Sequence, residues 1–503
     1  MTPSLPKERG SKRDTDMKSG GETTTTLGYL AAVEGGGTTF VVSVARFERS
    51  SDAGPRSPPP SSSHPSSSSE DDVVFLDRYT ALTILHTETV PSSSPGGPDE
   101  TLRRCAEILR RRRPARGYSA LGIATFGPVG LDPTDEDAYG KILRGSPKRD
   151  WRGVDVVTPL LDGCAGGGGG KEAVTSPPPH RIETDVNAPA LAEFAMWRSS
   201  VYGAGAGAAG EKGKVKIPSS LAYVTVGTGV GVGLVMNGEA VHGMMHPEGG
   251  HVAVSPLVGD RFGGGGGYSW GTARSPYGGV NTVEGLASSV ALTERLERER
   301  TDGGAGTGAA GDDVEKRDAL RSLPDDHKIW DHASNALANL CVTLALLTSV
   351  ERIVLGGGVM RRTVLYDTVR KKTGEILNGY LDLPQFTTDD GLRGYICESV
   401  WGDRAGLVGA FALALGALKK NEEEGGMGSG SSHAPEMEGR GVDAMQGEGE
   451  EEENKMTRAD FGALVDAEEE RKKLRRQSFV HGFVAATAMG VIVLALLNRG
   501  GRR

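Results

Sequence analysis

One aspartate and three glycine turns are the residues of this chain whose types and spacing could carry chemistry. Asp185, in the sequence TDVN, ends a predicted strand just before a predicted helix, where a carboxylate can accept a proton from a hydroxyl group. Its alternative role is to cap that helix. Glycine turns at Gly35–Thr38, Gly227–Gly233 and Gly356–Met360 expose backbone N–H groups to an anion such as phosphate. A single turn of this kind would be read as a plain hairpin, but three together favour an anion site.

Apolar segments with clear periodicity position these residues. A strand–turn–strand unit is predicted at Leu27–Phe47 and again at Leu221–Val241. Further strands are predicted at Asp77–Leu85, Tyr118–Gly127, Arg181–Val186 and Glu351–Met360. Helices are predicted at Thr101–Arg113, after Asn187, at Glu284–Arg300, at Lys328–Ser349 and toward Lys420. The repeated unit predicts an α/β fold of two similar lobes, 27–185 and 186–420, with a cleft between them and the last helix packing back on the first lobe.

Glycine is unusually frequent, with 75 of 503 residues, and many glycines lie in low-complexity runs that cannot form a packed core. The Ser/Pro-rich stretch 49–70 and the Gly-rich stretch 163–179 are predicted to be disordered inserts in the first lobe. Shorter inserts are predicted at 91–98, 203–214, 259–271 and 301–313. We expect all of them to be lengthened loops on a pre-existing fold, because loop-closure entropy grows slowly with length.

Charge and cysteine content exclude several classes of protein. The net charge of −9 argues against nucleic acid as a partner. The four cysteines lack CxxC spacing, which rules out a disulfide scaffold and a cysteine-rich zinc finger and suits a reducing compartment.

A set of motifs, in one order along Leu27–Lys420, resembles the ROK family of sugar kinases in the actin-like ATPase superfamily. The resemblance is strongest to its bacterial-type fructokinase branch. The segments that carry it are VEGGGTTF (33–40), IATFGPVGLD (123–132), SPKRDW (146–151), TDVNAPALAE (184–193), VTVGTGVGVGLVMNG (224–238), HPEGGH (246–251), VEGLAS (283–288), LGGGVM (355–360) and GDRAGLVGAF (402–411). The resemblance implies a two-lobed actin-like ATPase (ribonuclease H-like) fold and the transfer of phosphate from ATP to a hexose, most typically fructose.

The resemblance also implies roles for single residues. Asp185 would be the general base that activates the sugar hydroxyl, and Asn187, Glu248 and His251 would bind the sugar. ATP, with Mg²⁺, would bind at the glycine turns through Gly36, Gly37, Thr38, Gly227, Thr228, Gly229, Gly356, Gly357, Gly358 and Val359. A homodimer would also be in keeping with this family.

The chain departs from the family pattern at two functional positions. Thr39 stands where relatives usually carry a lysine after GGT, so a cation near the phosphates is missing. Fructokinases of this branch also usually hold a structural zinc ion, but SPYGGVNT (275–282) offers no Cys or His, and His251 is the only remaining candidate ligand. One histidine cannot hold zinc, which needs about four N or S ligands, so no zinc is expected.

Three alternatives to a fructokinase stay open. The first is a glucokinase and the second an N-acylmannosamine kinase, both of the same fold. The third is a catalytically weak sugar sensor held at a membrane, which Thr39 and the missing zinc ligands would favour. Residues 1–26 are too short and polar for the DNA-binding helix-turn-helix of the family's repressors.

The two ends of the chain predict its location. Residues 1–26 contain no apolar stretch typical of a secretory signal and are expected to be disordered. Residues 421–478 form an acidic, Gly-rich tether, and 479–497 are apolar and flanked by basic residues. Nineteen residues at 1.5 Å per residue nearly span the ~30 Å hydrocarbon core of a membrane. We therefore expect a C-terminal transmembrane anchor that leaves the remaining chain facing the cytosol at a membrane of unknown identity.

Overall fold

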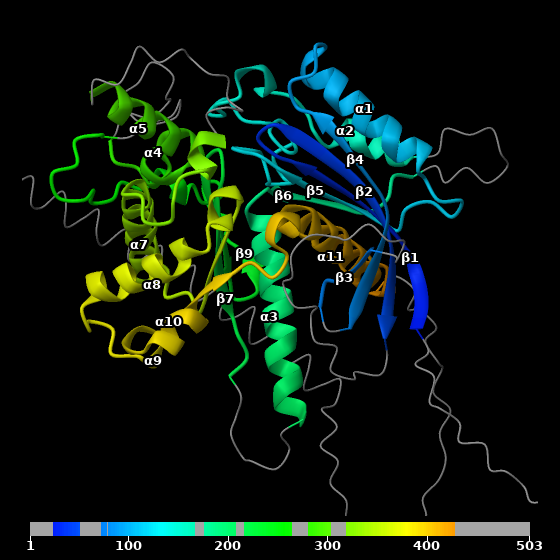
Figure 1. The fold of residues 1–503 in the computed structure, drawn as a ribbon. Coiled ribbons are helices and arrows are strands. Elements are labelled where there is room, and N and C mark those ends of the chain that lie inside the picture. The colour runs from blue at the N-terminus through cyan, green and yellow to red at the C-terminus, as the bar shows by residue number, and fades with distance from the viewer. Residues whose placement is uncertain are drawn as a thin grey trace, which may run out of the picture. The chain divides into compact units, whose positions relative to one another are not determined.

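The computed structural model describes residues 24–50, 72–77, 79–165, 176–207, 216–263, 280–302 and 318–427. They form an α/β fold built on two mixed β-sheets (Figure 1). Residues 428–478 of the predicted tether and the anchor predicted at 479–497 lie outside the described residues, as do residues 1–23. Of the helices that are described, none is both long enough and apolar enough to cross a membrane.

The first sheet has the strand order β3-β4-β2-β1-β5-β6. Its strands are β1 (Thr24–Gly35), β2 (Thr39–Ser50), β3 (Asp72–Phe75), β4 (Thr80–Pro91), β5 (Ala120–Thr125) and β6 (His180–Thr184). The first four pair antiparallel, whereas β5 and β6 run parallel to β1. All six positions of β5 are buried, as expected for a central parallel strand covered on both faces.

Alternating side chains of the first sheet face two different helical layers. Ala31 and Val33 of β1 pack with α1 (Gly97–Arg111), α2 (Thr158–Cys164) and the short helix η1 (Arg149–Trp151). Leu30 and Ala32 pack instead against α11 (Ala405–Met427) on the opposite face. The period-two alternation of a strand thus places one sheet between two layers of helix.

The second sheet has the order β11-β10-β7-β8-β9. Its strands are β7 (Ser220–Val226), β8 (Val230–Met236), β9 (Glu239–Ala240), β10 (Ile353–Gly356) and β11 (Ile396–Glu398). The helices of this half are α4 (Val283–Ala287), α5 (Ser289–Asp302), α7 (Ile329–Thr348), α8 (Val364–Leu377), α9 (Pro384–Thr387) and α10 (Asp389–Tyr395), with the short helices η2 (Gly249–His251), η3 (Gly358–Arg361) and η4 (Gly402–Arg404). Its largest apolar core lies between this sheet and α4, α5, α7 and α8.

Two helices connect the sheets. α3 (Asn187–Gly207) follows β6 directly and packs on β7 and β8, while α11 packs on β5, β1 and α3 (Figure 1). Small residues allow these close approaches: a Cβ added to Gly122 of β5 would lie 1.8 Å from the Ala410 carbonyl oxygen of α11. A Cβ added to Gly409 would likewise meet the Ala188 backbone of α3 at 2.5 Å.

Several predicted boundaries differ from the structure. The third strand, predicted at 77–85, is β4 and extends to Pro91, with the additional short strand β3 before it. The last helix continues to Met427, seven residues into the predicted tether. The predicted insert 259–271 begins as ordered chain, because the Asp260 carboxylate is buried against Arg295 at 2.7 Å and His332 at 3.0 Å.

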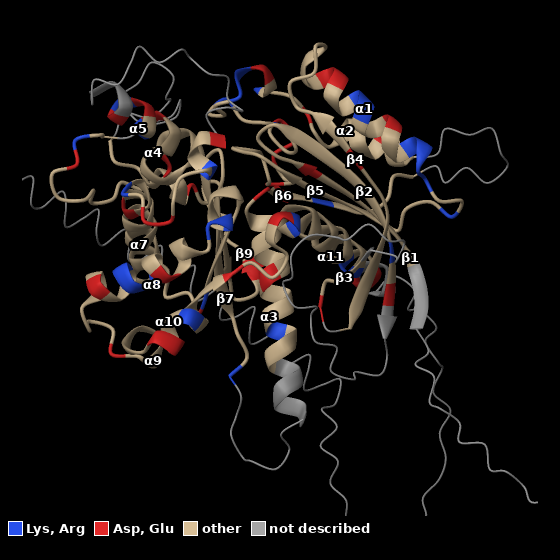
Figure 2. Cartoon of the chain, viewed as in Figure 1, with Lys and Arg blue, Asp and Glu red and all other residues tan. Residues whose placement is uncertain are grey.

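Charged side chains of both signs are interspersed over the described helices. Figure 2 shows no single basic face in this view of the described residues. In α1, Asp99 and Glu100 lie in the first turn and Arg110 and Arg111 in the last turn, as the helix dipole favours. That nucleic acid is no partner remains a prediction from the net charge.

Candidate active site

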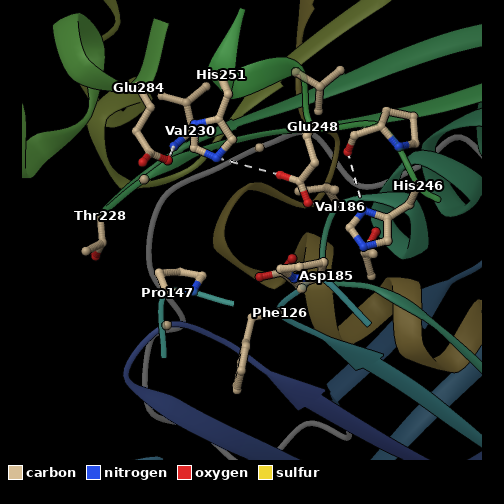
Figure 3. Close-up of a pocket in the computed structure, with 18 of the residues that line it drawn as sticks. Phe126, Pro147, Asp185, Val186, Thr228, Val230, His246, Glu248, His251 and Glu284 are labelled. Atoms are coloured by element: carbon tan, nitrogen blue, oxygen red, sulfur yellow. Dashed lines mark hydrogen bonds and ion pairs between the residues drawn. The ribbon is translucent and has the colours of Figure 1, made fainter. Parts of the chain in front are cut away.

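A recessed pocket lies between turns and loops that belong to both sheets (Figure 3). On the side of the first sheet it is lined by Gly37, Phe126, Gly127, Pro128, Pro147, Lys148, Thr184, Asp185 and Val186. On the side of the second sheet it is lined by Thr228, Gly229, Val230, Gly231, Val232, His246, Pro247, Glu248, His251 and Glu284. The pocket thus collects residues from segments that are far apart in the sequence.

Asp185 lies at the carboxyl end of β6, where the chain crosses from the first sheet into α3. Its backbone N–H donates to the Thr125 carbonyl oxygen at 2.8 Å, which fixes its position beside the end of β5. Burial raises the pKa of Asp185 to about 6, and the positive charge of Lys148 opposes this shift. A carboxyl group with such a pKa is mostly ionised at neutral pH and is a competent proton acceptor.

Thr184, and not Asp185, makes the capping hydrogen bond at the start of α3. The Thr184 hydroxyl accepts a hydrogen bond from the Asn187 backbone N–H at 3.0 Å, as an N-terminal cap does. Asp185 is therefore placed in the pocket, where Figure 3 shows it below Glu248 and His246.

Asn187, predicted to bind the sugar, does not line the pocket. It is fully buried, its Nδ2 donates to Glu183 Oε2 at 3.2 Å, and its Oδ1 accepts from the Leu234 backbone N–H at 3.3 Å. These bonds join the start of α3 to β6 and to β8. Two residues beyond Asp185 the chain has already entered the helix, and the Asn187 side chain points to the protein interior instead of the pocket.

Glu248 and His251 both line the pocket, as the resemblance implied. Glu248 Oε2 lies 3.7 Å from His251 Nε2, and Glu248 Oε1 lies 3.4 Å from His246 Nδ1. Burial raises the pKa of Glu248 to about 7 and lowers that of His251 to about 4. His251 is therefore neutral at physiological pH and can exchange hydrogen bonds with a polar ligand.

Glu284 is a pocket residue to which the sequence assigned no role, although it lies in the quoted motif VEGLAS. Its Oε2 accepts from the Val230 backbone N–H at 2.9 Å, and burial raises its pKa to about 7. Figure 3 shows the Glu284 carboxyl group next to Thr228 and His251. The signal that could have found it is the acidic residue within an otherwise buried motif.

The two predicted phosphate turns flank this pocket from opposite sheets. In the first turn, Gly37 lines the pocket, and the Gly36 N–H donates to the Thr39 carbonyl oxygen at 2.8 Å. In the second turn, Thr228 and Gly229 line it, and the Gly227 N–H donates to the Gly229 carbonyl oxygen at 2.8 Å. Thr38 and Gly227 belong to the same turns but do not line the pocket.

The third glycine run, Gly356–Val359, lies beside the second turn but outside the pocket. β10 runs parallel to β7, with Gly356 opposite Thr225, so both strands end at the same edge of the sheet. Gly357 has φ +91°, and a Cβ added there would lie 2.6 Å from the Val226 carbonyl oxygen. This is the edge at which ligands of parallel sheets usually bind.

Glu34 is a second carboxylate near Asp185 that the sequence analysis did not single out. It lies at the end of β1, against Gly406 in the first turn of α11. Burial, and next the charge of Asp185, raise the pKa of Glu34 to about 7. Mg²⁺ is typically held by one or two carboxylates together with substrate phosphates, and Glu34 and Asp185 are the carboxylates that would hold such an ion here.

Zinc has no complete ligand set among the described residues. No group of three or more His, Cys, Asp or Glu side chains in that part of the chain could hold a metal ion. His251 lines the pocket on the side of the second sheet, and most of the segment 275–282 lies outside the described residues. That no zinc is bound remains a prediction from the sequence.

Lys148 is a further pocket residue to which the sequence assigned no role. It lies in SPKRDW, which was quoted for the resemblance without a role for the lysine, and it is the only Lys or Arg among the described residues that line the pocket. Its ammonium group reaches the first phosphate turn, where Nζ donates to the Gly36 carbonyl oxygen at 3.2 Å.

Two mixed sheets that share one carboxylate-lined pocket define an α/β protein with a buried polar site facing two glycine turns. The family follows from comparison with known sequences. The sequence model described as "ROK family" matches residues 78–417, and the chain belongs to this family.

Curated relatives include fructokinases from two bacteria. The Zymomonas mobilis fructokinase is 34% identical over 67% of this chain and 91% of its own length. The Pediococcus pentosaceus fructokinase is 29% identical over 60% of this chain and 81% of its own length. Among solved structures, the ROK hexokinase from Thermus thermophilus aligns with a TM-score of 0.48 and 20% identity, covering 78% of this chain and 99% of that one.

Proposed function

We propose that this protein is an ATP-dependent hexose kinase that prefers fructose and forms fructose 6-phosphate. The observation that carries the proposal is Asp185, a half-buried carboxylate that lines one pocket together with a glycine turn from each sheet. A base beside an anion-binding turn is what phosphoryl transfer to a hydroxyl requires. Membership of the ROK family and the fructokinase relatives support the same reading.

The proposed step is an in-line displacement at the γ-phosphorus atom of ATP. The sugar hydroxyl oxygen forms a bond to that phosphorus while the bond from phosphorus to the bridging oxygen breaks, and ADP leaves with the bonding electron pair. The hydroxyl proton passes to the Asp185 carboxylate. Because the pKa of Asp185 is about 6, the group is largely unprotonated before the step at neutral pH.

The sugar would be held opposite Asp185 by the side chains of the second sheet. Glu248, His251 and Glu284 line the pocket and offer acceptors and donors for neighbouring hydroxyl groups. The cavity of about 210 Å³ is smaller than the ~300–1,000 Å³ typical of sites for drug-sized ligands, which suits a monosaccharide.

The nucleotide would bind with its phosphates between the two glycine turns. Backbone N–H groups near Gly37 and Thr228 suit phosphate oxygens. Mg²⁺, held near Glu34 and Asp185, would supply charge neutralisation on the β- and γ-phosphates. The adenosine would lie toward Gly356–Val359, at the same edge of the second sheet.

The choice of fructose rests on the curated relatives. A glucokinase or an N-acylmannosamine kinase would use the same base and turns. It would differ in the substrate groups with which Glu248, His251 and Glu284 form hydrogen bonds. The substrate is therefore decided by rates on competing sugars, expressed as kcat/KM.

The test is a coupled ADP-release assay on the full chain with fructose, glucose, mannose and N-acetylmannosamine. We expect the highest kcat/KM with fructose, and a fall of at least ~100-fold in the Asp185→Asn variant, because a positioned base contributes about 10²–10⁴-fold. Asp137→Asn, which removes an exposed carboxylate, is the matched control and should behave as the parent.

Two results would refute parts of this proposal. Sugar binding without turnover of any hexose would exclude the kinase and leave the sensor. Turnover with a higher kcat/KM for glucose or N-acetylmannosamine would keep the kinase and replace fructose as its substrate.

A further inference from the structure

We infer that Lys148 is the cation that binds the γ-phosphoryl group of the nucleotide and neutralises its charge during transfer. This inference rests on the proposed kinase function and adds a catalytic residue to it. Thr39, at the end of the first glycine turn, supplies no positive charge there. Lys148 supplies a positive charge to the same turn from a different segment of the chain.

The ammonium group of Lys148 lies at the base of the first phosphate turn. Nζ donates to the Gly36 carbonyl oxygen at 3.2 Å and to Ser92 Oγ at 3.3 Å. Ser92 in turn anchors the turn, since its N–H donates to the Thr38 carbonyl oxygen at 2.9 Å. The cation is therefore attached to the loop whose N–H groups would bind the phosphates.

Lys148 also lies beside the proposed base. Both residues line the same pocket, and the charge of Lys148 is the leading influence that opposes the burial-driven rise of the Asp185 pKa. Negative charge accumulates between the base and the phosphate turn during phosphoryl transfer, and a cation near both can neutralise it.

An aromatic cluster holds the lysine in this position. Its Nζ lies 3.9 Å from the centre of the Phe126 ring, a cation–π distance. Phe126 packs edge-on against Trp151 at 5.2 Å, and Trp151 Nε1 donates to the Ser92 carbonyl oxygen at 3.2 Å. The side chain is preorganised, so little conformational entropy remains to be lost when a ligand binds.

The partners of Lys148 leave its charge available to a ligand. Its hydrogen-bond acceptors are neutral oxygens, and no carboxylate of a described residue forms a direct ion pair with Nζ. Burial lowers the pKa of Lys148 to about 8, which reflects a cation that is poorly solvated at this position. An arriving phosphate oxygen would offer the anionic partner that the protein does not.

The experiment compares the full-length parent with Lys148→Met, Lys148→Arg and the control Arg149→Met. Arg149 is the adjacent residue, exposed and outside the pocket, so its variant removes one positive charge without touching the site. Binding of AMPPNP, ADP and fructose is measured by titration, and kcat and KM by the coupled assay. The melting temperature shows whether each variant is folded.

We expect Lys148→Met to lower kcat by roughly 100-fold or more, the usual effect of removing one donor to a developing charge. It should weaken AMPPNP at least ~10-fold and leave ADP and fructose within about twofold, because only AMPPNP carries a γ-phosphoryl group. Lys148→Arg should recover part of kcat, and Arg149→Met should match the parent.

Other outcomes would overturn the assignment. A Lys148→Met variant with the parent's kcat, or one that weakens ADP and AMPPNP equally, would show that Lys148 only supports the turn. A selective loss of fructose affinity would assign Lys148 to the sugar instead. A parent that phosphorylates no hexose refutes the proposed kinase, whereas an active parent with an equally active Lys148→Met variant refutes only the role of Lys148.

Discussion

Protonation of Asp185 should control the activity of this protein on the acid side of neutrality. Burial raises the pKa of this carboxyl group from an ordinary 3.8 to about 6. Only the ionised form can accept the sugar proton, so kcat/KM should rise with pH through a midpoint near 6 and level off above about pH 7. About nine tenths of the group is ionised at pH 7 and about a tenth at pH 5, which predicts a roughly tenfold loss between these values.

The same carboxyl group with its ordinary pKa would predict almost no loss, because it would still be more than nine-tenths ionised at pH 5. The size of the acid-side decrease therefore measures burial at Asp185. Three other carboxyl groups, Glu34, Glu248 and Glu284, have pKa values raised to about 7 and could contribute to the same decrease. The variant Asp185→Asn distinguishes the effect of Asp185 from that of the three glutamates, since it removes only one of the four carboxyl groups.

The assay is kcat/KM for fructose from pH 5 to 8, in the parent and in Asp185→Asn. The variant should lose about 10²–10⁴-fold at pH 7 and bind fructose nearly as well as the parent. Its residual rate should no longer fall tenfold toward pH 5. A variant that turns over as fast as the parent refutes the general base, and an unchanged acid-side midpoint assigns the titration to a glutamate.

Three further predictions concern other parts of the chain. Arg295→Met leaves Asp260 buried without its guanidinium partner and should lower the free energy of unfolding by roughly 3–5 kcal/mol. The control Arg321→Met, at an exposed ion pair, should lower it by less than ~1 kcal/mol. Equal melting temperatures of the two variants would contradict this prediction. Glu284→Gln should weaken sugar binding yet melt at a higher temperature than the parent, by a larger margin at pH 8 than at pH 5. The reason is that folding raises the pKa of Glu284 to about 7, so its ionised form destabilises the parent as the pH rises through this value. A variant that melts below the parent at pH 8 would contradict this. A fluorescent fusion of the full chain should fractionate with membranes, and one lacking 479–503 should not; equal solubility of both would disprove the anchor.

Local patterns predicted the elements better than their ends. The strand–turn–strand units at 27–47 and 221–241 are the hairpins β1–β2 and β7–β8, because tight glycine turns between apolar runs leave few alternatives. The end of α11 was missed by seven residues, since Glu422–Glu424 read as tether although such residues have high helix propensity. Asp260 shows what a local pattern cannot predict, because its ion-pair partners Arg295 and His332 are distant in the sequence.

The site shows the same division between local and long-range information. Asp185, Glu248 and Thr228 belong to short motifs, and the structure places all three in one pocket. Asn187 lies outside the pocket lining because a side chain at the start of a helix can face either the pocket or the interior, and here Glu183 and Leu234 bind it. Its role in sugar binding stays a prediction. Lys148 could not have been recognised from its own segment, since its partners at Gly36 and Ser92 come from other strands and turns.

The charged groups in and beside the pocket lower the stability of the folded chain. Glu34, Asp185, Glu248 and Glu284 all have raised pKa values and Lys148 a lowered one, with burial as the leading cause in every case. Each shift means that the charged form is less well solvated in the folded chain than in water, so these groups reduce stability at neutral pH. A ligand that binds the folded state alone stabilises it by mass action. Sugar and Mg²⁺-bound nucleotide offer the hydroxyl groups, the cation and the phosphate oxygens that these side chains lack, so their binding should raise the melting temperature most strongly when both are present.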